Sequence, residues 1–312
     1  LSNEKFNLTT GFQAHENLSK KNNDRYQYVL PYYTFDKKLF SSSNLGSFSL
    51  NSNGNNVLDN TNQLKSQINN NLSYSSYDYI SNKGIKNNFN IKLKNLNTVG
   101  KNISEYKSSP QIELLSIFEL SSSFPMIKRH EEYLNYLTPK LSLRANPSDM
   151  KNYSSTDRSI VNGNIFNIDR LGLTDSFEAG RSLTLGVDYK KETLNDVNKY
   201  FEAKLATVLR DKEENFIPSK TTLNKKTSNI FGSITNNFSD NFKLNYNFAI
   251  DNNLNQIEYN DISTTFSINN FVTKFNYVKE IDEMGDQNYL MNTTSYSLDD
   301  KNYFSFNPRR NR

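Results

Sequence analysis

The amino-acid sequence predicts an all-β protein, an antiparallel transmembrane β-barrel segment of about 15 strands that does not make a complete barrel. Three observations lead to this fold class. Apolar and polar residues alternate with a period of two, many candidate strands reach about ten residues, and long connections alternate with short ones.

Alternation is the dominant signal, and helical periodicity is absent almost everywhere. Period two is typical of strands that have one apolar and one polar face. In residues 242–251, the apolar set is Phe242, Leu244, Tyr246, Phe248 and Ile250, and the polar face carries Lys243, Asn245, Asn247, Ala249 and Asp251. Three further segments repeat the pattern through Leu64, Ile68, Leu72 and Tyr74, through Phe89, Ile91 and Leu93, and through Leu183, Leu185, Val187 and Tyr189.

Strand length and connection length both favour a membrane barrel. A tilted strand needs about nine to eleven residues to cross a bilayer, whereas strands of soluble proteins usually have five or six. Short turns at one rim and long loops at the other are typical of outer-membrane barrels, in which the turns are periplasmic and the loops extracellular. The short connections are 41–43, 239–241 and 269–270, and the long ones are 13–24, 98–109, 147–177 and 211–227. We expect the apolar face to contact lipid and the Asn/Lys/Ser face to line the lumen.

Composition narrows the alternatives. Only 35% of the 312 residues are hydrophobic and the mean hydropathy is −0.76, which is low for a water-soluble core of this size. The 19 Tyr and 21 Phe argue against disorder. No apolar run approaches the 18 or so residues of a membrane-spanning helix. A soluble β-sandwich would expose long strand edges, and a β-solenoid would show a fixed repeat, which we do not find.

Charge and cysteine content exclude further classes. The formal charge is +4 with acids and bases interspersed, so no basic stripe is present and nucleic acid is not an expected partner. The absence of cysteine excludes disulfides and zinc-thiolate sites within this stretch. Asparagine makes up about one residue in six, which suits turns and polar strand faces. The chain opens at Leu1-Ser2 without a signal segment, so we expect residues 1–312 to be part of a single barrel domain.

The longest connection, 147–177, is unusually rich in charge and leads into a regular strand. Paired acids and arginines hold a loop in place through charge-assisted hydrogen bonds, and glycines permit tight bends. We therefore expect a folded segment turned toward the lumen, against the alternative of a solvated surface loop. The residues that carry this expectation are Phe166, Asp169, Arg170, Gly172, Asp175, Glu178, Gly180 and Arg181.

The same stretch carries a resemblance. Asn164-Ile-Phe-Asn-Ile-Asp-Arg170, Leu171-Gly172, Asp175-Ser-Phe-Glu-Ala-Gly-Arg181 and Leu183-Thr-Leu-Gly-Val-Asp-Tyr189 resemble the signature of the LptD family of lipopolysaccharide-assembly proteins. Residues 25–33, 136–140 and 228–232 are also similar to that family, so the resemblance runs from about Arg25 to the end. The family's Asn-Arg-Phe is here Asp169-Arg170-Leu171, and a second arginine is replaced by Ser176.

The resemblance implies a translocon that passes lipopolysaccharide to the surface of a Gram-negative outer membrane. Its implied partners are lipopolysaccharide, an LptE-like lipoprotein plug, an LptA-like periplasmic bridge and outer-membrane lipid. It also implies that the amino-terminal periplasmic domain, the terminal strands and the lateral opening between them lie outside this chain. The motif loop is expected on the extracellular side, folded into the lumen.

Two other classes of function remain to be tested against this one. The first is a porin or ligand-gated importer, and the second is a barrel hydrolase. A serine hydrolase needs a histidine beside its nucleophile, and the chain has only His15, in a predicted loop, and His130, at a predicted strand start. We expect no enzyme activity, no cofactor and no transition-metal site, and the acids of the loop match no calcium-binding spacing. Pro31, Pro110 and Pro139 are expected at strand ends.

Overall fold

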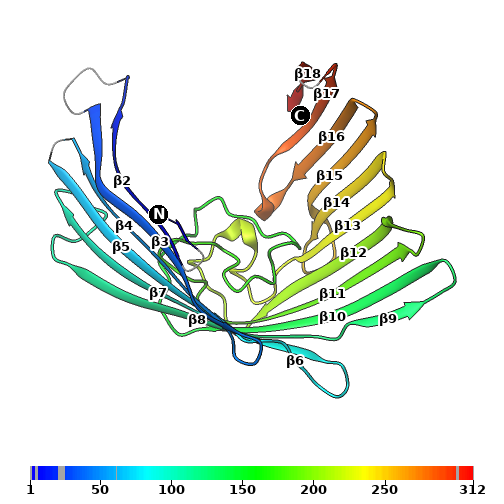
Figure 1. The fold of residues 1–312 in the computed structure, drawn as a ribbon, viewed down its shortest axis with the longest axis horizontal. Coiled ribbons are helices and arrows are strands. Elements are labelled where there is room, and N and C mark those ends of the chain that lie inside the picture. Colours follow the sequence, from blue (N-terminus) through cyan, green and yellow to red (C-terminus); the bar gives the residue numbers. More distant parts are fainter. Residues whose placement is uncertain (1, 4–5, 20–24, 61, 300–301, 312) are drawn as a thin grey trace.

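A single curved antiparallel sheet forms the framework of the protein (Figure 1). The computed structural model describes residues 2–3, 6–19, 25–60, 62–299 and 302–311. Fourteen strands have nine residues or more: β2 (Phe6–Glu16), β3 (Tyr26–Ser42), β4 (Gly46–Asp59), β5 (Gln63–Ser75), β7 (Lys86–Lys101), β8 (Gln111–Ser123), β10 (Tyr133–Asn146), β11 (Gly180–Thr193), β12 (Asp196–Arg210), β13 (Ile230–Ser239), β14 (Phe242–Ile250), β15 (Ile257–Ile268), β16 (Phe271–Glu280) and β17 (Asn288–Ser297). The shorter pieces are β1 (Ser2–Asn3), β6 (Tyr79–Ile80), β9 (Met126–Arg129), β18 (Tyr303–Phe306) and β19 (Arg309–Asn311).

Neighbouring long strands pair antiparallel in chain order, from β2 through to β17. Among the described residues, no pairing joins β2 to β17, so the sheet curls without closing. Figure 1 shows the two arms of this curve and the loops that lie between them. The predicted fold class, an incomplete antiparallel barrel segment of about 15 strands, is confirmed.

The two rims of the sheet differ as the sequence predicts. Connections 17–25, 102–110, 147–179, 211–229, 251–256 and 281–287 share one rim, which we call the long-loop rim. The opposite short-turn rim has connections 43–45, 194–195, 240–241 and 269–270. The tight 60–62 connection on the long-loop rim, and the longer hairpin extensions through β6 and β9 on the short-turn rim, are exceptions. Strand β2 runs further than expected, so His15 lies in a strand and not in a loop.

Register assigns each side chain to one face of the sheet. Ala249 of β14 is fully buried beneath the loops on the concave face, together with Phe231 of β13. Asn247 and Asn245 lie two and four positions before Ala249, so their side chains point to the same concave face. Tyr246 and Phe248 lie on the convex side, where the Phe248 ring covers Gly232. The predicted division of faces holds for this strand.

The convex face of one arm departs from the predicted apolar band. Ser52 of β4, Asn70 of β5 and Asn95 of β7 are cross-strand neighbours on that face. Ser52 Oγ donates to Asn70 Oδ1 at 2.7 Å, and Asn70 Nδ2 donates to Asn95 Oδ1 at 3.0 Å. We call these three residues the amide seam. Alternation predicts apolar residues at these three positions, because each shares a face with the apolar residues of its own strand. Their polar groups bond to one another there instead of to water.

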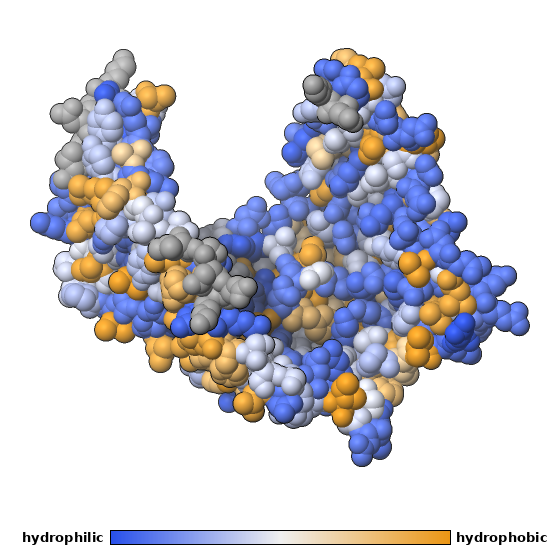
Figure 2. Space-filling view, viewed as in Figure 1, coloured by the Kyte–Doolittle hydropathy of each residue, from blue (hydrophilic) through white to orange (hydrophobic). Residues whose placement is uncertain are grey.

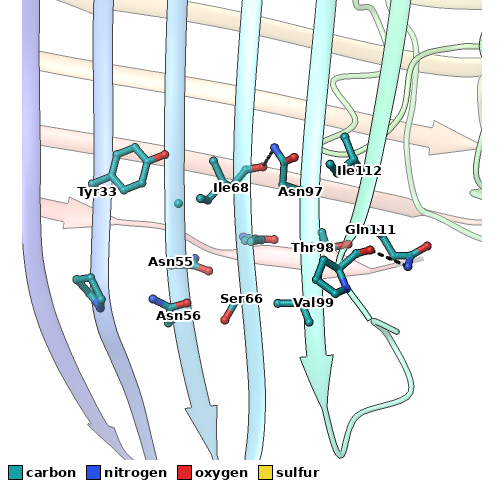
Figure 3. Close-up of a pocket in the computed structure, with 14 residues that line it drawn as sticks. Tyr33, Asn55, Asn56, Ser66, Ile68, Asn97, Thr98, Val99, Gln111 and Ile112 are labelled. Atoms are coloured by element: carbon teal, nitrogen blue, oxygen red, sulfur yellow. Dashed lines mark hydrogen bonds between the residues drawn. The ribbon is translucent and has the colours of Figure 1, made fainter. Parts of the chain in front are cut away.

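Next to the amide seam lies a shallow, mostly apolar groove of about 320 Å³, on the side of the long-loop rim (Figure 3). Gly54 and Ser66 leave its floor low, while Tyr33, Ile68 and Ile112 stand around it. Tyr33, Gly54, Ile68, Asn97 and Ile112 are successive cross-strand neighbours, which places the groove on the convex face.

Two prolines lie inside strands, so the expected strand-end placement is wrong for them. Pro31 falls within β3 at a register shift between Val29 and Tyr32, where a missing donor is tolerated. Pro139 falls within β10, and its carbonyl accepts from Phe124 N at 3.0 Å, at the break between β8 and β9. Pro110 precedes β8, as predicted.

Candidate functional site

The longest connection, residues 147–179, packs as a folded unit against the concave face, and we call it the central loop. Its described apolar side chains enter two clusters. One joins Met150, Ile160, Ile165, Leu171, Leu173 and Ala179 to Ala206, Val208, Phe231 and Ala249 of β12, β13 and β14. The other sets Phe177, with Ile168 against it, on Leu96, Leu115 and Ile117 of β7 and β8. The central loop therefore bridges both arms of the curved sheet.

Tight bends allow this packing. Gly172 and Gly180 have φ values of +59° and +77°, in the left-handed region that other residues enter only at a cost. Gly180 stands at the end of the central loop, where the chain enters β11. Both glycines that the sequence marked thus sit at turns that need them.

Glu178 is the electrostatic centre of the central loop. Its Oε1 lies 2.5 Å from Arg170 Nη2 and 2.5 Å from Arg210 Nη1, and its Oε2 accepts from Arg170 Nε at 2.5 Å. All three side chains are buried. Burial alone would raise the pKa of Glu178, but the charges of Arg170 and Arg210 lower it to about 2. The carboxylate therefore stays charged and ties the loop to β12.

A second buried ion pair continues this network into the sheet. Arg144 Nη2 of β10 lies 2.9 Å from Glu119 Oε1 of β8. Arg144 also donates to Ile165 O of the central loop at 3.3 Å and to Thr184 Oγ1 at 3.2 Å. Arg170 donates to the same Thr184 Oγ1 at 3.0 Å. Hydrogen bonds to charged groups are the stronger ones, so the loop is fixed here to β10 and β11, and Glu119 of β8 holds Arg144 in place.

Asp169, next to Arg170, binds the central loop to β7. Its Oδ2 lies 3.2 Å from Lys94 Nζ, which also donates to Leu173 O and, at 3.1 Å, to Ser176 O. The same ammonium lies 4.2 Å from the centroid of the Phe177 ring. Lys94 thus inserts from the sheet into the central loop and satisfies its backbone carbonyls.

Phe166 lies against the sheet at a point where only glycine fits. A Cβ on Gly186 of β11 would approach Phe166 Cζ to 2.7 Å and Leu205 O to 2.9 Å. Lys140 Nζ lies 5.6 Å from the Phe166 ring centroid and also pairs with Asp188. Gly186, the glycine of the predicted strand 181–189, therefore leaves the space in which the Phe166 ring packs.

Asp175 lies in a more open setting. Its side chain is 35% exposed, and it accepts a hydrogen bond from the Tyr153 hydroxyl and pairs with Lys151 at 3.0 Å. Burial raises the pKa of Asp175, but the hydrogen bonds from Tyr153 and Lys151 outweigh it and lower the pKa below its usual value. Both partners of Asp175 belong to the central loop, and Lys151 in turn lies 3.5 Å from Glu113 of β8, so Asp175 stabilises the fold of the loop and reaches the sheet only through Lys151.

Other connections of the long-loop rim cover the central loop. Ile217 and Leu223 of connection 211–229 and Met284 of connection 281–287 are buried in the first apolar cluster. The same two connections contain the short 3₁₀ helices η2 (Ser219–Thr221) and η3 (Asp282–Met284). Lys220 Nζ of η2 lies 3.1 Å from Asp157 of the central loop and 3.1 Å from Glu280 of β16. Three loops from one rim thus fold together over the concave face.

The structure brings together most of the residues that the sequence singled out, with one exception. Phe166, Asp169, Arg170 and Glu178 all face the sheet, whereas Arg181 is exposed on the convex face, opposite Ala145. Its place in β11 follows from alternation, because residue 181 shares the phase of Leu183 and Leu185. Arg181 therefore does not belong to the candidate site.

Three partners of the site were missing from the sequence prediction: Lys94, Glu119 and Arg210. Each lies on a strand that is far from the central loop in sequence. Each of the three is a charged residue on the polar face of its strand, which the sequence shows. Alternation does not show which of the charged residues on that face contact a loop.

The three acids of the central loop that the sequence singled out are engaged by cations of the protein itself. Asp169, Asp175 and Glu178 pair with Lys94, Lys151 and two arginines. Within the described part of the chain, no three His, Cys, Asp or Glu side chains gather as metal ligands.

Comparison with known families places this architecture. The family model described as "LptD: LPS transport system D" matches residues 1–301, nearly the whole chain. This chain belongs to the LptD family. The match extends the sequence resemblance toward the amino terminus from about Arg25. A search of the curated proteins found no match.

Membership of the LptD family decides among the functional alternatives. LptD proteins transport and assemble lipopolysaccharide at the outer membrane of Gram-negative bacteria. The family is a transport barrel and not an enzyme, so the hydrolase alternative is set aside, as is a general porin or importer. His130, the residue considered for a hydrolase site, lies at the short-turn rim, and its ring stacks on Tyr133 with 4.6 Å between centroids. Among the described residues, no helix is long and apolar enough to cross a membrane.

Proposed function

We propose that the central loop acts as a fixed cap in this LptD-family protein. It closes the lumen at the long-loop rim, while lipopolysaccharide is handled along the concave wall below. The observation that carries this proposal is the buried Glu178, which pairs with Arg170 in the loop and with Arg210 in the wall. Burying charged side chains costs free energy unless they are paired in a fixed geometry. A buried and paired network therefore indicates a loop that is fixed in place.

The two rims of the sheet then lie on opposite sides of the outer membrane. The long-loop rim faces the cell exterior and the short-turn rim faces the periplasm, as in outer-membrane barrels generally. The convex face contacts membrane lipid, and the concave face lines the path of the saccharide. Residues 1–312 then form part of one barrel domain whose remaining strands complete the wall.

Two protein partners complete the proposed machine. The hollow between the arms is open beside the loops (Figure 2), and there an LptE-like lipoprotein plug would sit inside the barrel. An LptA-like bridge would deliver lipopolysaccharide from the periplasmic side, at the short-turn rim. Acyl chains would leave through an opening in the wall and the sugars would follow through the polar interior.

The test is substitution of the anchoring arginine in the complete protein, in cells that depend on it. Arg170→Ala leaves Glu178 with one partner and should reduce the heat-modifiable barrel in outer membranes and admit a large antibiotic. Asp175→Ala should have a smaller effect, because its side chain is 35% exposed.

The matched control is Asn152→Ala, an exposed position whose Oδ1 accepts only from Ser154 N, at 3.0 Å, within the described chain. Lys151, which the sequence alone would offer as a second control, pairs with Asp175 and is unsuitable. Normal barrel level and normal permeability in Arg170→Ala would show that the central loop is not a required cap.

A further inference from the structure

A polar pocket lies beneath the central loop, between it and the short-turn rim. Its volume is about 490 Å³, and Phe166 lines it from the loop side. The opposite walls come from β7, β8 and β10. Hydroxyl and amide side chains dominate the lining, among them Asn88, Asn90, Ser121 and Ser123. The pocket thus lies on the concave face at the periplasmic side of the proposed cap.

The charges of the pocket are already paired. Lys140 pairs with Asp188, and Lys86 Nζ lies 2.7 Å from Asp78. The remaining charged group, Glu119, is buried and binds Arg144. A phosphate or carboxylate ligand would need cations that have no protein partner. The pocket therefore favours a neutral ligand over an anion.

Several polar groups remain for such a ligand. Asn90 Nδ2 donates to Glu119 Oε2 at 3.0 Å, and Asn88 Nδ2 donates to Ser76 O at 2.8 Å. Each amide is oriented by the protein and keeps its carbonyl oxygen for a further donor. Ser121 Oγ, held near Asn88 O at 3.4 Å, can still accept a hydrogen bond. Preoriented acceptors of this kind recognise hydroxyl groups.

Phe166 adds the apolar element. Its ring is seated on Gly186 and is half-buried, so one part of it is fixed while the pocket side stays available. A pyranose ring has one face of C–H groups and a rim of hydroxyls, which matches an aromatic face flanked by amides and serines. Ligand sites commonly combine such a surface with a few placed polar groups.

We propose that this pocket binds a neutral hexose of the lipopolysaccharide saccharide as it crosses the concave face. The inference rests on the proposed function, because it takes the concave wall as the path of the sugars. It adds a defined station on that path, with Phe166 as the stacking residue and Asn88, Asn90 and Ser121 as its hydrogen-bonding side.

The experiment places a photo-crosslinking amino acid at Ser121 in the complete protein. The matched control is Leu120, its neighbour on the convex face. In cells, Ser121 should crosslink to lipopolysaccharide more strongly than Leu120 does. Phe166→Ala should lower the Ser121 crosslink roughly two- to tenfold, the range expected for one aromatic contact, and Phe166→Tyr should retain it.

Competition with the purified protein identifies the ligand chemistry. Delipidated core oligosaccharide should protect Ser121 from the crosslink to lipopolysaccharide, whereas inorganic phosphate should not. Protection by phosphate alone would overturn the assignment to a saccharide.

The same cells separate failure of this pocket from failure of the proposed cap. If Ser121 does not crosslink while Arg170→Ala still makes the membrane leaky, the cap stands and the pocket is off the sugar path. An unchanged crosslink in Phe166→Ala would likewise remove Phe166 from the site.

Discussion

The centre of the sheet and the arm beside it treat polar residues in opposite ways. On β10–β12, the convex face between the rims is mostly apolar, with leucines such as Leu141, Leu183 and Leu209, and the buried charges Arg144 and Arg210 lie on the concave face under the central loop. On β4–β7, the convex face carries the amide seam and its apolar groove (Figure 3). Successive side chains point to opposite faces of the sheet in both regions, whatever their polarity. The alternation shows which residues share a face of the sheet. Whether those residues are buried depends on what covers that face.

The comparison predicts that the largest loss of stability comes from the covered charges. Glu178→Ala leaves Arg170 and Arg210 buried without their carboxylate, and breaking a buried pair costs about 3–5 kcal/mol. We expect the purified complete protein to unfold at lower denaturant concentration, measured by loss of heat-modifiability on gels.

The control is an exposed acid of the central loop whose partner lies in connection 211–229. Asp157 is 79% exposed and pairs with Lys220, so Asp157→Ala should change stability by no more than about 1 kcal/mol. Equal midpoints for the two variants would mean that the buried network adds nothing to the folded state.

The second prediction tests the two faces of one strand. Tyr246 is in the middle of β14 on the convex face, and Tyr246→Arg should cost about 2–4 kcal/mol if that face meets the middle of a bilayer. Asn245→Arg, one residue away on the concave face, should be tolerated. The measurement is the amount of each variant assembled in outer membranes. Assembly of Tyr246→Arg together with failure of Asn245→Arg would invert the assignment of faces.

Much of this architecture was accessible from sequence because strands have a simple period. The alternation in residues 242–251 predicted both the strand and its faces. Arg170 and Glu178, eight residues apart, were recognised together, and they pair directly.

The rest depends on strand register and on long-range contact. Glu119 and Arg210 meet the network only because β8, β10, β11 and β12 are aligned at a particular register, which a period of two does not specify. Arg181 was misassigned because motif membership was given more weight than its phase. Asn70 and Asn95 were invisible because two polar residues on neighbouring strands satisfy each other only once those strands pair.

The smallest predicted effect belongs to the amide seam. Asn70→Ala removes the acceptor of Ser52 and the donor to Asn95, so two polar groups on the convex face lose a partner. Hydrogen bonds between side chains in a membrane average about 0.6 kcal/mol and reach about 1.7, so we expect a loss of about 0.5–2 kcal/mol by denaturant unfolding in lipid vesicles. The control is Asn71→Ala, the next residue, which faces the concave side and donates to Asn51 at 3.2 Å. Because Asn71→Ala removes one cross-strand side-chain hydrogen bond and Asn70→Ala removes two, Asn71→Ala should cost less. A larger loss at Asn71 would mean that the concave side of this arm is the drier one, and that the amide seam faces water or a polar partner.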